Sequence, residues 1–227
     1  PRFGQKKRRI NEPLYVLMSS GVSQRRASVI LKVNRKTIVR HVRFLAAQKR
    51  IEHDAFMEKN YKDAPVSVIQ FDDLETSEHT KCKPLSVTLA IDPIRRKILN
   101  YKVSQMPAKG LLVHLARRKY GPRADKRPKG WDQLMKELVP YVSKDAVWTS
   151  DENPHYPKFL KRHHQKSTHI QVKGGRGCIA GQGELKKLHF DPLFILNHTC
   201  AMLRANMNRL FRKTWYTTKN IQGLEDH

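Results

Sequence analysis

Two aspartates follow short apolar segments, in positions where their side chains could bind a metal ion. Asp72 comes after residues 66–71 and Asp151 comes after residues 146–150, and both segments are rich in β-branched and aromatic residues. Such segments predict strands, and the carboxyl ends of neighbouring strands can bring side chains together. Because Mg²⁺ prefers oxygen ligands and can assist displacement at a phosphodiester, the pair predicts a magnesium site. Either acid alone is also explained as an ordinary turn residue.

The charge of the chain narrows the choice of partner. The 227 residues include 45 Lys and Arg against 20 Asp and Glu, a formal net charge of +25. Solubility needs far less charge, so the excess predicts a polyanionic partner, with nucleic acid as the first expectation. The composition, with 39% hydrophobic and 29% charged residues, is typical of a globular protein.

Other patterns point to a compartment and exclude several classes of protein. The sequence has no apolar run long enough for a membrane span and no signal-peptide pattern. Cys82, Cys178 and Cys200 form no C-x-x-C pair, so they predict neither a disulfide framework nor a zinc ribbon. We therefore expect a cytoplasmic, nucleoid-associated protein without a membrane partner.

Charge density and composition divide the chain into two predicted domains. Residues 1–60 hold 15 Lys and Arg but only 4 acids, and residues 60–65 lack apolar periodicity and end in Pro65. We expect an all-α helix-turn-helix domain with a basic N-terminal tail over 1–60, and a larger domain over 61–227. The basic residues of the tail are Arg2, Lys6, Lys7, Arg8 and Arg9.

The first domain shows the spacing of a helix-turn-helix. Ser23 can cap a helix through Leu31, and Asn34 can cap a second helix through about Ala47. The apolar positions of the second helix, Ile38, Val42 and Leu45, are three and four residues apart and predict a buried face. The opposite face would contact DNA, as second helices of this motif do, unless it is simply a solvated basic surface. Its members are Arg35, Lys36, Thr37, Arg40 and Arg43.

Strands and helices alternate in the second domain. We expect strands over 66–71, 85–91 and 97–105, helices over 110–120 and 131–142, a strand over 146–150, a helix over 155–164 and a strand over 168–172. An exposed loop over 121–130 and a glycine-rich loop over 174–183 interrupt this order, and a long helix begins at Asp191. The order predicts a mixed α/β domain that begins with an antiparallel meander.

Three motifs resemble those of a known family. They are Gln70-Phe71-Asp72-Asp73, Thr149-Ser150-Asp151 with Tyr156 downstream, and Leu203-Arg204 followed by the segment 209–214. Together they resemble DDE transposases of the insertion-sequence-one type, mobile-element enzymes. The resemblance implies a ribonuclease-H-like mixed sheet flanked by helices, and Mg²⁺ as cofactor with Mn²⁺ as a substitute. It also implies binding of terminal inverted repeats, strand cleavage, strand transfer to target DNA, and a homodimer or larger assembly on DNA.

The third metal ligand departs from the family pattern. The family has a glutamate seven residues before the arginine matched by Arg204, where this chain has Asn197. The resemblance therefore implies Asp72, Asp151 and Asn197 as the catalytic and metal-binding residues. Because an amide oxygen brings no charge, we expect weaker metal binding than with three carboxylates. Glu184 and Asp191 are alternative ligands, although helix capping accounts for Asp191 before Pro192, and Asn197 could be an ordinary helix residue.

Further basic residues could contact DNA beside this site. Lys173 and Arg176 belong to the glycine-rich loop, which lacks the G-K-[ST] ending of a nucleotide-binding loop, so no nucleotide cofactor is expected. The long last helix is expected to carry Arg204, Arg209, Arg212 and Lys213. Solvated surface charge is the alternative for both groups.

Two other classes of function stay open at this stage. A catalytically inactive transposase-derived DNA-binding protein would explain the helix-turn-helix and the asparagine equally well. A structure-specific nuclease on the same fold would cut DNA without joining it.

Overall fold

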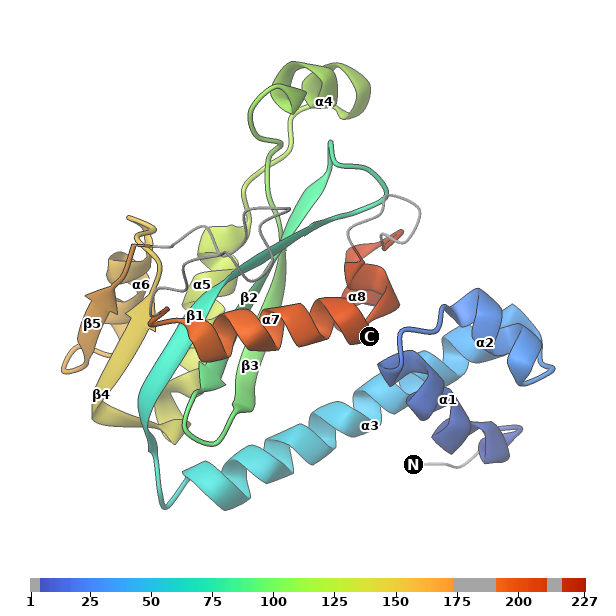
Figure 1. Ribbon diagram of the computed structural model, residues 1–227, viewed down its shortest axis with the longest axis horizontal. Coiled ribbons are helices and arrows are strands. Elements are labelled where there is room, and N and C mark those ends of the chain that lie inside the picture. The colour runs from blue at the N-terminus through green and yellow to red at the C-terminus, as the bar shows by residue number, and fades with distance from the viewer. Residues whose placement is uncertain (1–4, 174–190, 212–217) are drawn as a thin grey trace, which may run out of the picture.

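The computed structural model describes residues 5–173, 191–211 and 218–227 and has an α/β fold (Figure 1). A five-stranded mixed sheet is flanked by helices, and a helical region forms the N-terminal part. The helices are α1 (Asn11–Ser19), α2 (Gln24–Ile30), α3 (Arg35–Tyr61), α4 (Leu112–Tyr120), α5 (Arg127–Leu138), α6 (Tyr156–His163), α7 (Phe194–Asn206) and α8 (Ile221–Glu225). The strands are β1 (Val66–Ser77), β2 (Pro84–Asp92), β3 (Lys97–Gln105), β4 (Val142–Ser150) and β5 (Thr168–Gln171). Short 3-10 turns are η1 (Arg8–Ile10), η2 (Val139–Tyr141) and η4 (Asn208–Leu210).

The sheet has the strand order β3-β2-β1-β4-β5. β1, β2 and β3 form the expected antiparallel meander, whereas β4 and β5 run parallel to β1. The carboxyl ends of β1, β3, β4 and β5 therefore lie at one edge of the sheet.

The first strand is longer than expected. The prediction that it ends at Asp72 is wrong, because β1 continues to Ser77 and Thr76 still pairs with Leu85 of β2. The antiparallel ladder with β2 holds these additional residues in extended conformation. Asp72 consequently lies within a strand rather than at its end.

The predicted helix over 131–142 is shifted toward the N-terminus. α5 begins at Arg127, inside the expected loop, with Pro128 in its first turn, and it ends at Leu138. Proline fits a first turn, where its missing N–H is not needed, but it breaks a helix interior. Pro140 therefore lies in the short turn η2, and β4 already begins at Val142.

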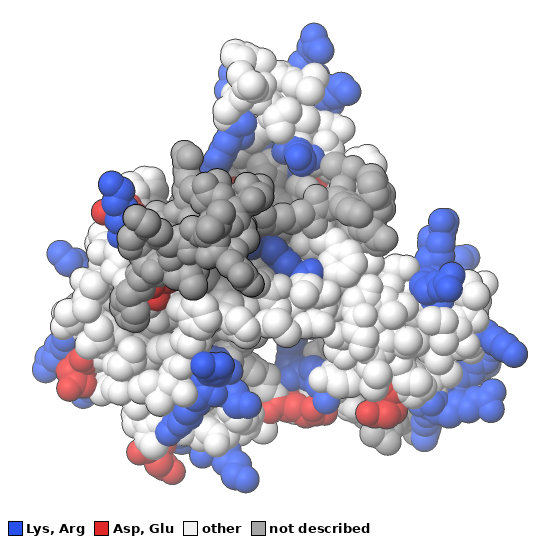
Figure 2. All heavy atoms as spheres, in the orientation of Figure 1, with Lys and Arg blue, Asp and Glu red and all other residues white. Residues whose placement is uncertain are grey.

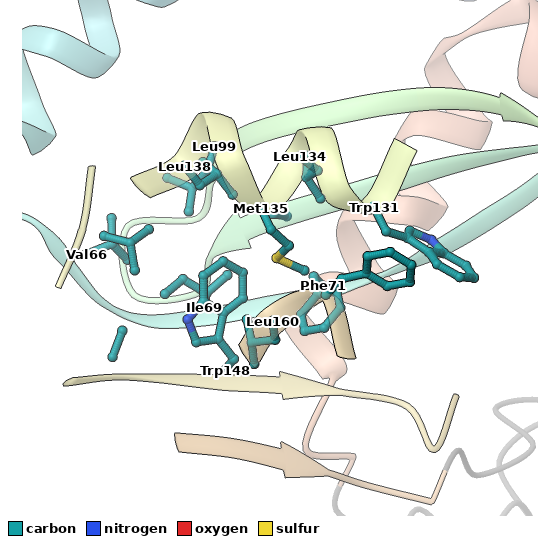
Figure 3. Packing of buried hydrophobic residues seen from close by; sticks show 14 of the residues in the cluster. Val66, Ile69, Phe71, Leu99, Trp131, Leu134, Met135, Leu138, Trp148 and Leu160 are labelled. Carbon is teal, nitrogen blue, oxygen red and sulfur yellow. The ribbon is translucent and has the colours of Figure 1, made fainter. Parts of the chain in front are cut away.

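Aromatic and aliphatic side chains fill the space between the sheet, α5 and α6 (Figure 3). Phe71, Trp131 and Trp148 are almost fully buried, and the rings of Phe71 and Trp148 meet edge to face at 5.6 Å. On the other face of the sheet, Leu193 and Leu196 near the start of α7 pack against β2. Both faces of the central strands are thus covered, which agrees with their apolar sequences.

The N-terminal helices confirm the expected caps. The Ser23 hydroxyl accepts from the Arg26 N–H at 3.2 Å, and Asn34 Oδ1 accepts from the Lys36 N–H at 2.8 Å. Ile38 and Val42 are buried in a small core of their own, with Leu45 packed against it. Residues 31–34 form the turn that connects α2 with α3, and the shared core holds the two helices together.

The second helix of this pair is much longer than expected. The prediction that it ends near Ala47 is wrong, because α3 runs on to Tyr61. Its far end is buried in the core of the sheet through Met57 and Tyr61, and the Tyr61 hydroxyl donates to Asp92 Oδ2 at 3.1 Å. One continuous helix therefore connects the N-terminal helices with the sheet.

No helix in the described part of the chain is both long enough and apolar enough to cross a membrane.

A substitution at Leu134 tests how much the main core contributes to stability, because this side chain of α5 is fully buried against the sheet. Leu134→Ala should lower the free energy of unfolding by about 2 to 5 kcal/mol, since it leaves a cavity. Leu111→Ala is the matched control, because Leu111 is 99% exposed, and it should change stability by no more than about 0.5 kcal/mol. Urea unfolding followed by circular dichroism measures both values, and equal losses would contradict this description of the core.

Candidate active site

One carboxylate lies on β1, and a second directly follows the neighbouring parallel strand β4. Gln70 of β1 pairs with Thr149 of β4, and the same register continued by two residues brings Asp72 opposite Asp151. Burial, and next the charge of Asp151, raise the pKa of Asp72 to about 7. Burial is also the main cause that raises the pKa of Asp151. The sequence prediction that these two acids converge is therefore consistent with the geometry.

Tyr156 at the start of α6 orients Asp72. Its hydroxyl donates to Asp72 Oδ1 at 3.3 Å, and its ring packs against Phe71 and Trp131. Burial, together with the nearby carboxylates, raises the pKa of Tyr156, so the hydroxyl keeps its proton and serves as a donor. The sequence motif includes Tyr156 only as a residue downstream of Asp151, because its contact with Asp72 depends on tertiary packing.

The backbone at Asp151 is held by side chains from β4 and β5. The carbonyl of Asp151 accepts from the Ser150 hydroxyl at 2.8 Å and from Gln171 Nε2 at 3.2 Å. His169 Nε2 lies 2.9 Å from Ser150 Oγ, and burial lowers the pKa of His169, which favours its neutral form. These bonds fix the turn that carries the carboxylate.

Asp73 points to the other face of the sheet and has a structural role. Its Oδ1 accepts from Trp131 Nε1 at 3.1 Å and from the Thr88 hydroxyl at 2.5 Å. Adjacent residues of a strand point to opposite faces, so this orientation leaves Asp72 as the acid of β1 that faces α7.

Helix α7 passes over the same face of β1 as Asp72. Gln70 Nε2 donates to the carbonyl of Pro192 at 2.8 Å, and the Leu196 N–H donates to Gln70 Oε1 at 3.1 Å. Farther along α7, burial raises the pKa of Cys200 to about 11, and the charge of Asp72 acts in the same direction. The turn of α7 that contains Asn197 therefore lies near Asp72.

The side chain of Asn197 itself is turned toward the start of α7. It is exposed, and its Nδ2 donates to Asp191 Oδ2 at 2.8 Å. Asp191 Oδ1 accepts from the Leu193 N–H at 2.9 Å, in the turn before α7. The prediction that the last helix begins at Asp191 is wrong, because α7 begins at Phe194 and its N-cap is Leu193, which has no side-chain cap bond. The other candidate third ligand, Glu184, lies outside the described residues.

The surroundings of the two acids suit a divalent cation. None of the ion pairs found among residues 5–173, 191–211 and 218–227 involves Asp72 or Asp151, although the protein has 45 Lys and Arg. Two close carboxylates without a basic partner favour binding of a cation or a proton. In that same described part, no group of three His, Cys, Asp or Glu side chains is arranged to hold a metal. The two acids by themselves therefore do not make a complete metal site.

The residues of α3 that are expected to contact DNA lie mostly at the surface. On α3, Arg35, Lys36, Arg40 and Arg43 are exposed and Thr37 is half-buried. Figure 2 shows basic side chains gathered on the lobe formed by α1, α2 and the start of α3, at the right of the view.

The basic residues expected to contact DNA near Asp72 and Asp151 differ in their exposure and position. Lys173 is exposed, and Arg204 is half-buried on α7. The prediction that one long helix carries Arg209 is wrong, because α7 ends at Asn206. Arg209 lies in η4, where it is half-buried and donates to the Thr218 hydroxyl at 2.9 Å. Arg176, Arg212 and Lys213 lie outside the described residues.

No model of a known protein family matches the chain, and no curated protein matches its sequence.

Asp72 makes stability depend on pH. Because its pKa in the folded protein is about 7, against 3.8 for an ordinary aspartate, its ionisation opposes folding. The stabilising effect of the protonated acid is complete below pH 4 and is lost as the pH rises through 7. Without metal, Asp72→Asn should therefore raise the free energy of unfolding at pH 8 by about 1 to 3 kcal/mol.

This increase in the free energy of unfolding of Asp72→Asn should become smaller as the pH is lowered toward 4. Denaturant unfolding in EDTA at several pH values measures it, with Asp63→Asn at an exposed position as the control. A gain that is the same at pH 8 and pH 4 would show that Asp72 is not the destabilising acid.

Proposed function

We propose that the protein is a DNA transposase with a ribonuclease-H-like catalytic domain. The observation that carries this proposal is the placement of Asp72 on β1 and of Asp151 directly after the adjacent parallel strand β4, in a five-stranded mixed sheet. An antiparallel meander followed by two parallel strands with intervening helices is compatible with that fold. The motifs that resemble insertion-sequence-one transposases contain these same two acids.

The residues of the site have separate roles in this proposal. Bound Mg²⁺ or Mn²⁺ would activate the attacking oxygen and stabilise the leaving oxygen of a phosphodiester. Asp72 and Asp151 supply carboxylate oxygens as metal ligands, and Tyr156 orients Asp72 through its hydroxyl. Asn197 would supply its amide oxygen as a third ligand, and phosphate oxygens of DNA would supply further ligands.

The helix-turn-helix would supply sequence recognition. The first turn of α3 presents Arg35, Lys36 and Thr37 at the end of a helix, with Arg40 one turn later. In a major groove, such a first turn meets base edges while arginines bind phosphates. We propose terminal inverted repeats and target DNA as the partners, and a homodimer or larger assembly on paired DNA ends. In a cell, such a protein would be cytoplasmic and nucleoid-associated.

A catalytically inactive DNA-binding protein is the second candidate. It is favoured by the bond between Asn197 and Asp191 and by the absence of a third metal-binding acid beside the pair in the described ranges. The two candidates differ in whether the acids are needed for strand chemistry.

Asp72→Ala and Asp151→Ala should each reduce strand cleavage and joining more than about a thousandfold, because the metal loses a carboxylate ligand. Affinity for the same DNA should stay within about threefold, since neither acid lies on the helix-turn-helix. The assay uses DNA from both flanks of the gene with Mg²⁺ or Mn²⁺, and Asp145→Ala at an exposed position of β4 is the control. DNA that is bound but cut by no variant, wild type included, would favour the inactive protein. Cutting without joining would identify a nuclease.

Asn197→Glu should increase the affinity for Mg²⁺ if position 197 is a ligand, because a carboxylate replaces a neutral amide oxygen. The Mg²⁺ concentration for half-maximal cleavage should fall by roughly tenfold. Asp191→Asn is the comparison, since it disturbs the partner of Asn197 without adding charge at position 197. An unchanged requirement for Mg²⁺ in Asn197→Glu would assign the third ligand elsewhere.

A further inference from the structure

The segment 106–126, here called the α4 arm, projects from the edge of the sheet where β1 and β3 end (Figure 1). Its base is anchored: the Lys126 N–H donates to the carbonyl of Gln105 at 3.0 Å, and Gln105 Nε2 donates to the carbonyl of Ala124 at 3.1 Å. Lys109 pairs with Glu75 at 2.5 Å and Arg123 pairs with Glu78 at 3.1 Å. The arm therefore has a fixed attachment to the β1–β2 hairpin, while its helix extends beyond the body of the protein.

The arm exposes apolar side chains that its own contacts do not cover. Leu111, immediately before α4, is 99% exposed, and Tyr120 at the end of the helix is 42% exposed. Scattered exposed apolar residues are normal on a protein surface. Leu111, however, is almost fully exposed at the start of a helix that projects from the protein, so its side chain contributes little to the packing of the fold.

The arm is also strongly basic. It contains six Lys and Arg but a single acid, Asp125. Arg117, Arg118 and Lys119 are exposed, and no ion pair of the described residues includes them. Figure 2 shows basic side chains on the arm, at the top of the view. Basic residues in a last turn do stabilise the helix dipole, but this effect leaves their charge free to bind an anion.

The position of the arm relates it to the candidate active site. β3 runs parallel to β1 and β4, so the arm leaves the sheet at the same edge at which β4 ends and Asp151 follows. From Asp72 to the end of β1 is five residues, or about 16 Å of extended strand, which is less than the width of a DNA duplex. A duplex that reaches the acids would therefore pass beside the arm.

We propose that the α4 arm is a second DNA-binding element, which holds the duplex that flanks the cleaved strand. Arg117, Arg118 and Lys119 bind phosphates, and Leu111 inserts between base pairs as an apolar wedge. Apolar side chains flanked by basic residues bend DNA in this way in other proteins. The inference rests on the proposed function, because it takes DNA as the ligand of the site.

The charge of the arm is tested with the triple variant Arg117→Ala, Arg118→Ala and Lys119→Ala. In EDTA, binding of the full chain to a random-sequence duplex is measured by fluorescence anisotropy at several salt concentrations. The slope of log affinity against log salt is negative, and each lost phosphate contact makes it shallower by about 0.9. We therefore expect the magnitude of the slope to fall by about 2 to 3. The matched control is Lys97→Ala, Lys144→Ala and Lys166→Ala, which removes three exposed charges at the opposite edge of the sheet.

The wedge is tested with Leu111→Ser and a duplex that contains 2-aminopurine, whose fluorescence rises when bases unstack. Wild type should increase the fluorescence, and Leu111→Ser should lose most of the increase. Ile94→Ser is the control, since Ile94 is 73% exposed in the β2–β3 turn at the opposite edge. Circular dichroism should show that all these surface variants are folded.

The outcomes separate this inference from the proposed function, because neither measurement requires strand cleavage. An unchanged salt slope in the triple variant, or the same decrease in the control, would overturn the binding role of the arm. Loss of binding to phosphatidylserine vesicles with an unchanged DNA slope would overturn it in favour of a lipid surface. Failure of the wild-type protein to bind any DNA would overturn the proposed function as well.

Discussion

The parallel pairing of β1 with β4 is the interaction on which the candidate site depends. It sets Asp72 opposite Asp151, although both acids are partly buried and burial opposes their ionisation. The aromatic core beneath the two strands supplies the packing that keeps them in register (Figure 3). Asp73, by contrast, faces that core and has hydrogen-bond donors there. Asp72 and Asp73 are adjacent in the sequence, yet the strand directs the candidate metal ligand and the structural acid to opposite faces of the sheet.

A second constraint is the continuous helix α3. Its first turns pack against α1 and α2, while residues of its last turns are buried in the core of the sheet. His53 Nε2 donates to the Leu99 carbonyl at 2.9 Å, and Arg50 binds Asp226 near the C-terminus at 2.9 Å. These bonds attach the middle of the helix to β3 and the residues after α8. The basic face of α3 therefore has a defined orientation relative to the acids, which a flexible linker would not provide.

Several features followed from the sequence alone because their causes are local. Ser23 and Asn34 cap helices through their own side chains, and apolar spacing within α3 identified Ile38 and Val42 as buried. β3 has the expected bounds, since alternation and flanking turn residues define it. The sequence expectation that Asp72 and Asp151 lie near each other is consistent with the parallel pairing of β1 with β4, although Asp72 lies within β1 and not at its end.

Other features depend on contacts between residues distant in sequence. The extension of α3 to Tyr61 and of β1 to Ser77 is stabilised by the core and by β2, respectively. The bond from Tyr156 to Asp72 joins residues 84 positions apart, and no local pattern indicates it. The sequence by itself singled out Asp72 and Asp151 as candidate metal ligands. Only the tertiary structure decided how they are oriented and that Asn197 is bound to Asp191, because side-chain partners are selected by packing rather than by spacing.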